Sequence, residues 1–317
     1  MPRMLAAIVL LLTLTMTSIT APLTAAQDAT PAAGKDRLIT DTMGLPELAI
    51  TATADAYEGV PSETAAGRYV VTLTSAMGAD ASAGVEFLML PEDVPFDDFM
   101  TILSESLDTS GGPPEWYYQT HLAGGLATDP ESTSQGIFDL RPGTYVVWSG
   151  GDPEAPQPPV ELTVTGEAAT PTAAAEPAAA ATVTMFEYGF KVDGQLLPGP
   201  QLLKVANVGA QPHFMVLVQP NQPVTKEQVG MVLEAEMAGT PTADAAAAAG
   251  VSNPDEWRFA EYAGTISMGA AEWIATDLEP GTYVLVCFAP DIESGMPHAY
   301  LGMYDVVTVG DGGTPTP

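Results

Sequence analysis

An order of segments that occurs twice constrains the fold of this 317-residue chain more than any other feature. The first copy contains, in order, RYVVTLTS (68–75), VEFLMLPEDVP (85–95), PPEW (113–116), FDLRPGTYVVW (138–148) and VELTVTG (160–166). The second copy contains LLKVANV (202–208), HFMVLVQPNQP (213–223), PDEW (254–257), TDLEPGTYVLV (276–286) and VVTVG (306–310). Because the five segments keep their order and PGTYV is identical in both copies, the sequence predicts a duplicated structural unit.

Most of these segments have the composition of strands. They are short, rich in β-branched and aromatic residues, and bounded by Gly, Pro or Asn. One helix is predicted in each copy, from apolar residues at helical spacing in the first and from a capping-box pair, Thr225 and Gln228, in the second. The apolar positions of these helices are Phe96, Phe99, Leu103 and Leu107, and then Val229, Val232, Leu233 and Met237. The sequence therefore predicts an all-β chain of two tandem Greek-key β-sandwiches, each with one excursion helix.

The first 26 residues have the features of a secretory signal peptide. A positive start, MPRM, precedes the apolar run LAAIVLLLTLTMTSI and the small residues PLTAA. We expect cleavage near Ala26, with an uncleaved N-terminal anchor as the alternative. No later run of eighteen apolar residues occurs, so we expect no stable membrane span in the mature chain. The predicted location is extracytoplasmic, in the periplasm or at the cell exterior.

Composition divides the remaining chain. Residues 166–181 form an Ala/Pro/Thr linker between two predicted units, 44–165 and 182–310. The segment GTPTADAAAAAG (239–250) is similar in composition but interrupts the second copy, which indicates a surface insertion. The tail, 311–317, is expected to be disordered.

Charge and cysteine content exclude several classes of function. With 40 acidic and 9 basic residues the net charge is −31, and such a surface repels a phosphate backbone, so nucleic acid is not an expected partner. A single cysteine, Cys287, excludes an internal disulfide. In an oxidising compartment a lone thiol is expected to be buried or to bind a metal.

Soft metal ligands gather in the second copy. His213 follows the turn NVGAQP and opens a predicted strand, whereas Cys287 ends another. His298 and Met303 follow on the loop after Cys287, and two loops at one end of a sandwich can bring these four residues together. Two imidazoles and a thiolate, with a weak axial thioether, are the ligand set of a blue-copper centre. Met296 is a second thioether, but it precedes His298.

From TVTMFEYGF (182–190) to VVTVG the second copy resembles the cupredoxin family, which includes plastocyanin and azurin. By that resemblance His213, Cys287, His298 and Met303 are the ligands of one type 1 copper ion. The chain departs from the family in three places. The Cys–His loop has ten residues, Phe214 stands where Asn is usual, and Phe288 follows the cysteine where a small hydroxyl residue is common. These changes bear on the reduction potential, because hydrogen bonds to the sulfur tune it.

The first copy has no equivalent ligand set. Aligning the two PGTYV segments puts Ser149 opposite Cys287, and Gly84 or Val85 opposite His213. His121 falls opposite Glu261, outside the site. The resemblance therefore implies a ligand-free cupredoxin-like first unit, which serves as a spacer or as a docking surface for a partner.

Enzymatic copper chemistry is not expected. The three histidines of the chain cannot supply a trinuclear cluster, and Val286 stands where a copper nitrite reductase has a histidine before its cysteine. No G-x-S-x-G elbow and no phosphate-binding glycine loop occur. The sequence predicts an exported blue-copper protein that transfers single electrons to or from an unknown partner protein. Copper storage or delivery without redox cycling, and a non-metal interaction module with a decayed site, are the alternatives.

Overall fold

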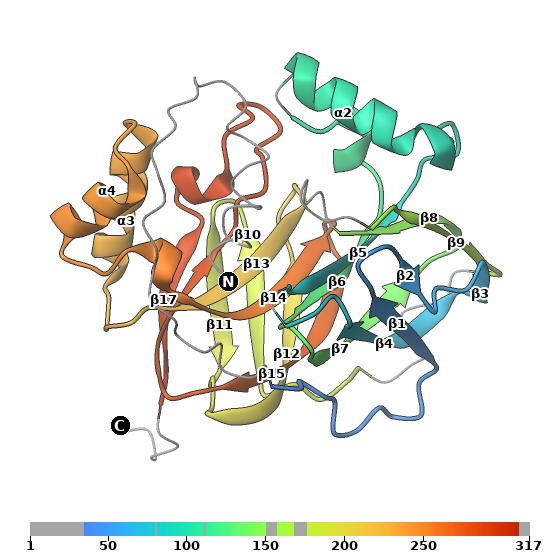
Figure 1. Cartoon of the computed structure of the whole chain (residues 1–317), viewed down its shortest axis with the longest axis horizontal. Helices are drawn as coiled ribbons and strands as arrows, with labels where there is room; N and C mark the ends of the chain where they lie inside the picture. Colours follow the sequence, from blue (N-terminus) through green and yellow to red (C-terminus); the bar gives the residue numbers. More distant parts are fainter. Residues whose placement is uncertain (1–34, 80, 111, 150–156, 168–175, 311–317) are drawn as a thin grey trace.

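The computed structural model describes residues 35–79, 81–110, 112–149, 157–167 and 176–310 (Figure 1). In these residues the fold is mostly β, with strands in two sheets that face each other across the main core. The predicted all-β class is confirmed. The predicted signal peptide, the tail and the middle of the predicted linker lie outside the described residues.

Each sheet contains strands from both copies of the repeat. The eight-stranded sheet has the order β11 (Gly189–Gly194), β10 (Ala181–Phe186), β12 (Gly199–Asn207), β15 (Ala271–Leu278), β7 (Thr133–Leu140), β4 (Gly67–Ser75), β1 (Glu47–Ala52) and β2 (Tyr57–Glu58). The nine-stranded sheet has the order β17 (Tyr304–Val309), β16 (Gly281–Val286), β13 (His213–Gln219), β14 (Arg258–Ile266), β6 (Leu122–Thr128), β5 (Ala83–Met89), β8 (Gly143–Trp148), β9 (Val160–Thr165) and β3 (Glu63–Ala65). We call β1–β9 the N-terminal half and β10–β17 the C-terminal half.

The two halves repeat details of structure as well as of sequence. The pairing of β5 with β6 shifts register between Phe87 and Leu88, and the pairing of β13 with β14 shifts between Leu217 and Val218. The tyrosines of the two PGTYV segments, Tyr145 and Tyr283, are both fully buried. Each hydroxyl accepts a hydrogen bond at 2.9 Å from the backbone N–H four residues earlier. The shared PGTYV thus forms the same buried corner twice.

The halves are joined edge to edge, in a contact that we call the seam. In one sheet β7 pairs with β15, and Gly136 lies opposite Ile274. When the two PGTYV segments are aligned, Gly136 and Ile274 occupy the same position of the repeat. In the other sheet β6 meets β14 at Ala123 and Ile266. Both pairings are antiparallel, so a local twofold axis relates the halves, and each sheet continues across the seam. The expected tandem sandwiches are therefore fused, because their edge strands pair with each other.

Buried carboxyl groups cross the seam. Glu86 of β5 accepts hydrogen bonds from the Tyr262 hydroxyl and from the backbone N–H and hydroxyl of Thr265, all three on β14. Glu272 of β15 accepts the N–H of Gly125 on β6 at 3.1 Å. Burial raises the pKa of both carboxyl groups. Each half therefore supplies a buried acid that accepts at least one hydrogen bond from the other half, although Oε1 of Glu272 has no partner among the described residues.

Arg37 adds an ion pair to the seam. Its guanidinium lies 3.1 Å from Glu261 of β14 and 3.0 Å from Asp129 of the N-terminal half. Burial raises the pKa of Glu261 to about 7, although the positive charge of Arg37 acts in the opposite direction. Arg37 precedes the predicted unit boundary at residue 44, and the unit boundaries themselves stay predictions.

The helices follow the predicted pattern, with one addition. α2 (Phe99–Ser110) follows a short 3₁₀ helix, η1 (Phe96–Asp98), and α3 (Lys226–Met237) begins with the predicted capping box of Thr225 and Gln228. Met237, expected on the buried face, is 52% exposed because α3 ends there, beyond its packed turns.

A third helix corrects the prediction of one helix per copy. The segment predicted as a surface insertion contains α4 (Thr242–Ala249), which packs beside α3 (Figure 1). Ala245, Ala246 and Ala249 are buried. Low-complexity alanine was a misleading signal, since alanine has the highest helix propensity and lets helices approach closely.

The segments PPEW and PDEW lie in or beside short 3₁₀ helices, η2 (Glu115–Tyr118) and η3 (Pro254–Glu256).

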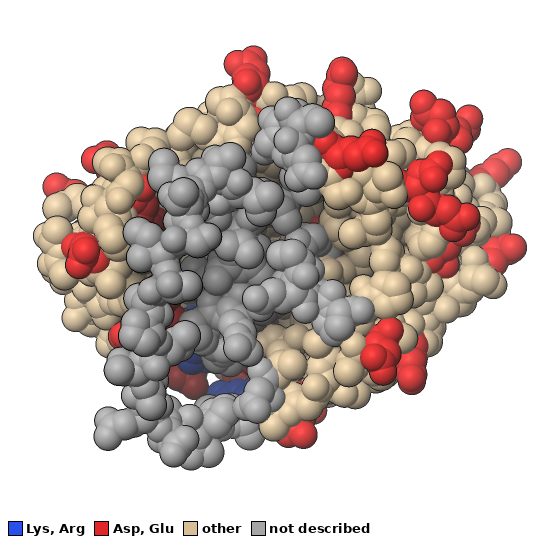
Figure 2. Space-filling view, turned by 45° about the horizontal axis from the view of Figure 1, so that its top comes forward, with Lys and Arg blue, Asp and Glu red and all other residues tan. Residues whose placement is uncertain are grey.

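Across the described part of the chain, no helix has both the length and the apolar character to cross a membrane. Acidic side chains are scattered over the face drawn in Figure 2, where basic ones occupy only a small area. The exposed charge therefore opposes binding to a phosphate backbone.

Candidate metal centre

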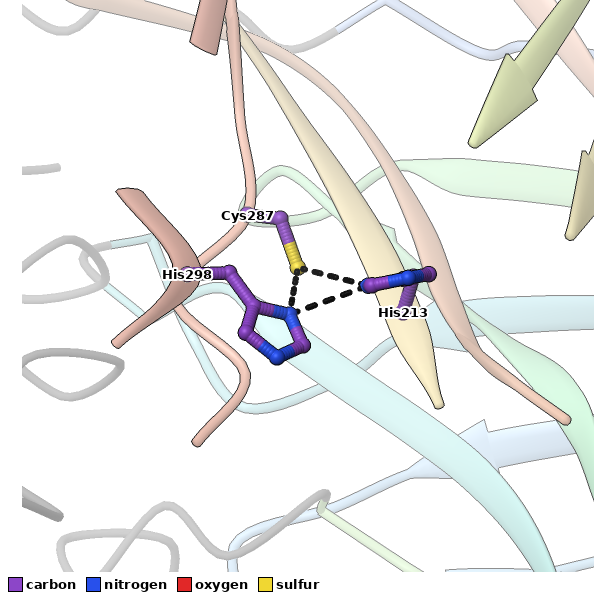
Figure 3. A group of neighbouring side chains, drawn as sticks. All are labelled: His213, Cys287 and His298. Atoms are coloured by element: carbon purple, nitrogen blue, oxygen red, sulfur yellow. Dashed lines mark hydrogen bonds between the residues drawn. The ribbon is translucent and has the colours of Figure 1, made fainter. Parts of the chain in front are cut away.

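Three potential ligand side chains meet at one end of the C-terminal half (Figure 3). His213 is the first residue of β13, and Cys287 follows the last residue of β16. Because these two strands are antiparallel neighbours, the start of one lies beside the end of the other. His298 begins the 3₁₀ helix η4 (His298–Leu301), which returns the chain towards β17. All three side chains are fully buried.

The ligand atoms form a small triangle. The Nδ1 atoms of His213 and His298 are 2.9 Å apart, and the sulfur of Cys287 lies 4.0 Å from the first and 3.7 Å from the second. A point equidistant from the three atoms lies about 2.1 Å from each, within the range of about 2.0–2.3 Å for bonds from nitrogen and sulfur to a metal such as zinc. The protein alone therefore holds three donors at the spacing that a trigonal metal ion requires.

Met303 is held next to two of these residues by the backbone. Its N–H donates to the His298 carbonyl at 2.9 Å, and its own carbonyl accepts the Cys287 N–H at 3.2 Å. The Met303 side chain is fully buried, whereas that of Met296, the rival thioether, is partly exposed. Burial and backbone contacts thus favour Met303 as the fourth donor, and its role as a ligand stays a prediction.

Burial decides the protonation of the three groups in the metal-free protein. It lowers the pKa of His298 to about 4, helped by the neighbouring His213, and it also lowers the pKa of His213. Burial raises the pKa of the Cys287 thiol to about 12. At neutral pH both imidazoles are therefore uncharged, and the thiol loses its proton only when a cation takes the proton's place.

The sulfur keeps two backbone donors despite the departures from the cupredoxin pattern. The N–H groups of Phe214 and Ala289 donate to Cys287 and act against the effect of burial on its pKa. The Phe214 side chain, which replaces the usual Asn, packs against Tyr262 with ring centres 5.9 Å apart. Phe288 packs against Tyr300 at 6.3 Å. The unusual side chains thus enter the packing while the backbone contacts to sulfur remain.

A hydrogen-bonded group that the sequence did not reveal ties the loops together. Asp291, in the Cys–His loop, accepts from the Tyr188 hydroxyl at 2.6 Å and from the Gln211 amide at 2.8 Å. The Gln211 oxygen accepts the N–H of Ile292 at 2.7 Å. Burial acts to raise the pKa of Asp291, but the hydrogen bonds from Tyr188, Gln211 and Ser294 hold it below its usual range. Gln211 and Asp291 thus link the loop before His213 to the Cys–His loop.

Glu187 is a second residue near the candidate metal centre that the sequence did not predict. Its carboxylate lies 3.1 Å from Nε2 of His213, on the side of the imidazole ring away from the triangle. Burial acts to raise the pKa of Glu187, but N–H groups of the chain, mainly those of Gln211 and Ala210, together with His213 lower it. Glu187 is therefore a carboxylate in contact with a candidate ligand. The segment TVTMFEYGF, which contains Glu187, shows no ligand pattern in the sequence. Glu187 approaches His213 only because strands that are distant in the chain pair with each other.

At the equivalent place in the N-terminal half, the described residues, which leave out 150–156, contain no group of three candidate ligands. β5 pairs with β8 at Glu86 and Trp148, as β13 pairs with β16 at Val216 and Val286. This register places Ser149 at the position of Cys287, as predicted. It places Ala83 at the position of His213, one residue before the predicted Gly84 or Val85. His121 corresponds to Arg258 rather than to Glu261, because Met89 of β5 contacts His121 where the matching Gln219 of β13 pairs with Arg258.

The N-terminal half also reaches the candidate centre. The Tyr118 hydroxyl, at the end of η2, donates to the carbonyl of Pro290 at 3.4 Å. Pro290 lies in the Cys–His loop and pairs with Pro297 at the other end of that loop. The ligand-free half therefore packs against the loop that carries Cys287 and His298.

The chain is similar to several solved structures. They include auracyanin from the photosynthetic bacterium Roseiflexus castenholzii, at 23% identity and a TM-score of 0.26 over 41% of this chain and 94% of that chain. An azurin from Methylomonas sp. strain J matches at 16% identity and 0.25 over 40% and 95%. Copper nitrite reductase from Nitrosomonas europaea matches at 14% identity and 0.22 over 84% and 94%. No protein-family model and no curated protein matches the chain.

The class follows from the chain's own two-sheet topology, its repeated tyrosine corner and its buried group of two histidines and a cysteine. The protein is a β-sandwich protein of two fused, similar halves. Its His–Cys–His group has the donor types and the spacing to bind a copper ion.

Proposed function

We propose that the chain is an exported type 1 copper protein that transfers single electrons. In this proposal His213, Cys287 and His298 would bind the metal, and Met303 would be a fourth, weaker ligand. The observation that carries the proposal is the buried triangle of two Nδ1 atoms and one sulfur. The signal-like residues 1–26 support the export part of the proposal.

Bound copper supplies the change between Cu(II) and Cu(I), which accepts and returns one electron. The chain supplies a soft sulfur, two neutral imidazoles and a frame that suits both oxidation states. The triangle is set by β13, β16 and η4 and by the hydrogen bonds of Gln211 and Asp291, so little movement is needed when the charge changes. With copper bound, the chain would take one electron from a reduced partner protein and pass it to an oxidised one, and no covalent bond in the chain would change.

A carrier fits the described residues better than an enzyme with a second metal. Among the residues that the structure describes, His213, Cys287 and His298 form the one group of three or more His, Cys, Asp or Glu side chains whose ligand atoms lie within 4.8 Å of one another. Val286, before the cysteine, offers no ligand atom for a second copper. The proposal therefore assigns no catalytic residue.

Copper titration of the metal-free protein, followed by visible absorption and metal analysis, tests this function. We expect one copper per chain and an intense thiolate-to-Cu(II) charge-transfer band that disappears on reduction and returns on oxidation. Cys287→Ser is expected to lose the band, because serine offers no thiolate. Ser149→Cys, at the matching position of the N-terminal half, is the control and should add no second band.

Two results would replace the proposal by one of the alternatives. Tight binding of Cu(I) with no coloured Cu(II) form would indicate storage or delivery. A wild-type protein that takes up no copper would leave the interaction module with a decayed site.

A further inference from the structure

The two candidate histidine ligands differ on the side away from the triangle. Nε2 of His213 lies 3.1 Å from Oε1 of Glu187, while Nε2 of His298 is buried and has no hydrogen-bond partner among the described residues. The same oxygen of Glu187 accepts the N–H of Gln211 at 2.8 Å. Glu187 thus contacts both His213 and the loop that leads into it.

The loop is shaped to receive this carboxylate. A Cβ atom added to Gly209 would lie 2.5 and 2.7 Å from the two oxygens of Glu187, closer than atoms can pack. Asn207 shapes the same loop, since its side chain accepts the Gly209 N–H at 2.8 Å and donates to the Gln211 carbonyl at 2.7 Å. The carboxylate therefore sits in a space that only glycine at position 209 leaves open.

The contact decides which nitrogen of His213 carries a proton. A carboxylate at Nε2 favours the tautomer with hydrogen on Nε2, which leaves the Nδ1 lone pair pointing into the triangle. The Nδ1 atoms of His213 and His298 are only 2.9 Å apart, so one must donate to the other in the metal-free protein. His298 is then the donor, since its own Nε2 finds no acceptor within the described residues.

We propose that Glu187 is the positioning residue of this centre, fixing His213 in its metal-binding tautomer and biasing bound copper towards Cu(II). The second part rests on the proposed function. A negative charge one imidazole ring away from the metal stabilises the more positive ion, so it lowers the reduction potential. His298, with no such partner, exerts no comparable bias.

Two variants separate the charge of Glu187 from its hydrogen bond. Glu187→Gln keeps an acceptor for Nε2–H and removes the charge, whereas Glu187→Ala removes both. Glu63→Gln, an exposed carboxyl on β3 of the other half, controls for the loss of one negative charge. Nitrogen-15 NMR of the metal-free proteins reports the histidine tautomers, and competition with Cu(I) and Cu(II) chelators reports the two affinities.

In the metal-free wild type we expect hydrogen on Nε2 of His213 and on Nδ1 of His298. Glu187→Gln should keep these tautomers but lower the affinity for Cu(II) relative to Cu(I) about tenfold, which raises the potential by about 59 mV for a one-electron couple. Glu187→Ala should lose the single tautomer as well. Glu63→Gln should behave as the wild type.

Unchanged tautomers in Glu187→Ala would overturn the positioning role, and an unchanged affinity ratio in both variants would overturn the bias towards Cu(II). A wild type that binds no copper would overturn the proposed function and, with it, the bias. The NMR comparison would still decide whether Glu187 fixes His213, because it needs no metal. The two failures are therefore distinguishable.

Discussion

The two halves of the molecule have matching strands, but they differ in the residues at the strand ends where the candidate metal centre lies. Both contain the PGTYV corner, and both shift register at the same place between their matching strands. Where the C-terminal half has His213 and Cys287, the N-terminal half has Ala83 and Ser149. The fold therefore does not depend on the ligands. The candidate metal centre is a set of side chains at one end of a strand arrangement that the other half forms without them.

The largest effect on copper affinity is expected from replacing a histidine of the candidate metal centre, compared with the same replacement in the other half. Each half has a buried histidine, His298 in the triangle and His121 beside Tyr145. His298→Ala should lower copper affinity about a thousandfold, or about 4 kcal/mol, because losing a ligand costs more than the roughly 10–100-fold effect of losing a ligand's hydrogen-bond partner. His121→Ala should leave the affinity unchanged. Equal losses in both variants, measured by chelator competition, would show that the site depends on general packing.

The seam shows a second difference between the halves. In the aligned strand pairs Glu261 and Tyr262 of β14 correspond to Gly124 and Gly125 of β6. An added Cβ on Gly264 would overlap the backbone of Gly125, so the two strands approach each other at glycines. At these two positions β6 has glycines where β14 has large polar side chains, so the two matching edge strands are not equivalent.

Glu261 should make the stability of the metal-free protein depend on pH. The folded chain keeps this proton up to pH about 7, whereas a carboxyl in the unfolded chain loses it near 4.5. Raising the pH across that range therefore destabilises the fold, and Glu261→Gln, which has no proton to lose, should escape this loss. The variant should gain up to about 3 kcal/mol relative to wild type between pH 4.5 and 7.5.

Urea unfolding at several pH values measures this difference. Glu63→Gln, on exposed β3, controls for the removal of one charge. A difference between Glu261→Gln and wild type that stays constant from pH 4.5 to 7.5 would mean that the Glu261 carboxyl is ionised in the fold throughout.

The smallest effect separates the helices of the two halves. Thr225 caps α3 by accepting the Gln228 N–H at 3.2 Å, whereas the 3₁₀ turn that leads into α2 starts at Pro95 with no side-chain cap. Thr225→Ala should lower the free energy of unfolding by about 1 kcal/mol. Thr101→Ala, on the exposed surface of α2, is the control and should change it by less than about 0.5 kcal/mol. Equal changes would mean that the cap adds nothing beyond helix propensity.

Local patterns accounted for much of the fold and for the candidate ligands. Strand segments, the α3 capping box and the order His213, Cys287, His298, Met303 were visible because turn residues, periodicity and ligand type are properties of short stretches. α4 was missed because an alanine-rich helix has no apolar periodicity, and its burial depends on α3. The difference between Ala83 and the predicted Gly84 or Val85 is one of register, which strand pairing alone decides.

The sequence by itself determined the duplication, the all-β class and the types of donor available to a metal. Only the tertiary structure decided that the two sandwiches share their sheets, that Glu86 and Glu272 are buried across the seam, and that Glu187 contacts His213. The physical reason is that these contacts join residues far apart in the chain. Their side chains meet only after edge strands pair, and no local pattern records which edges do so.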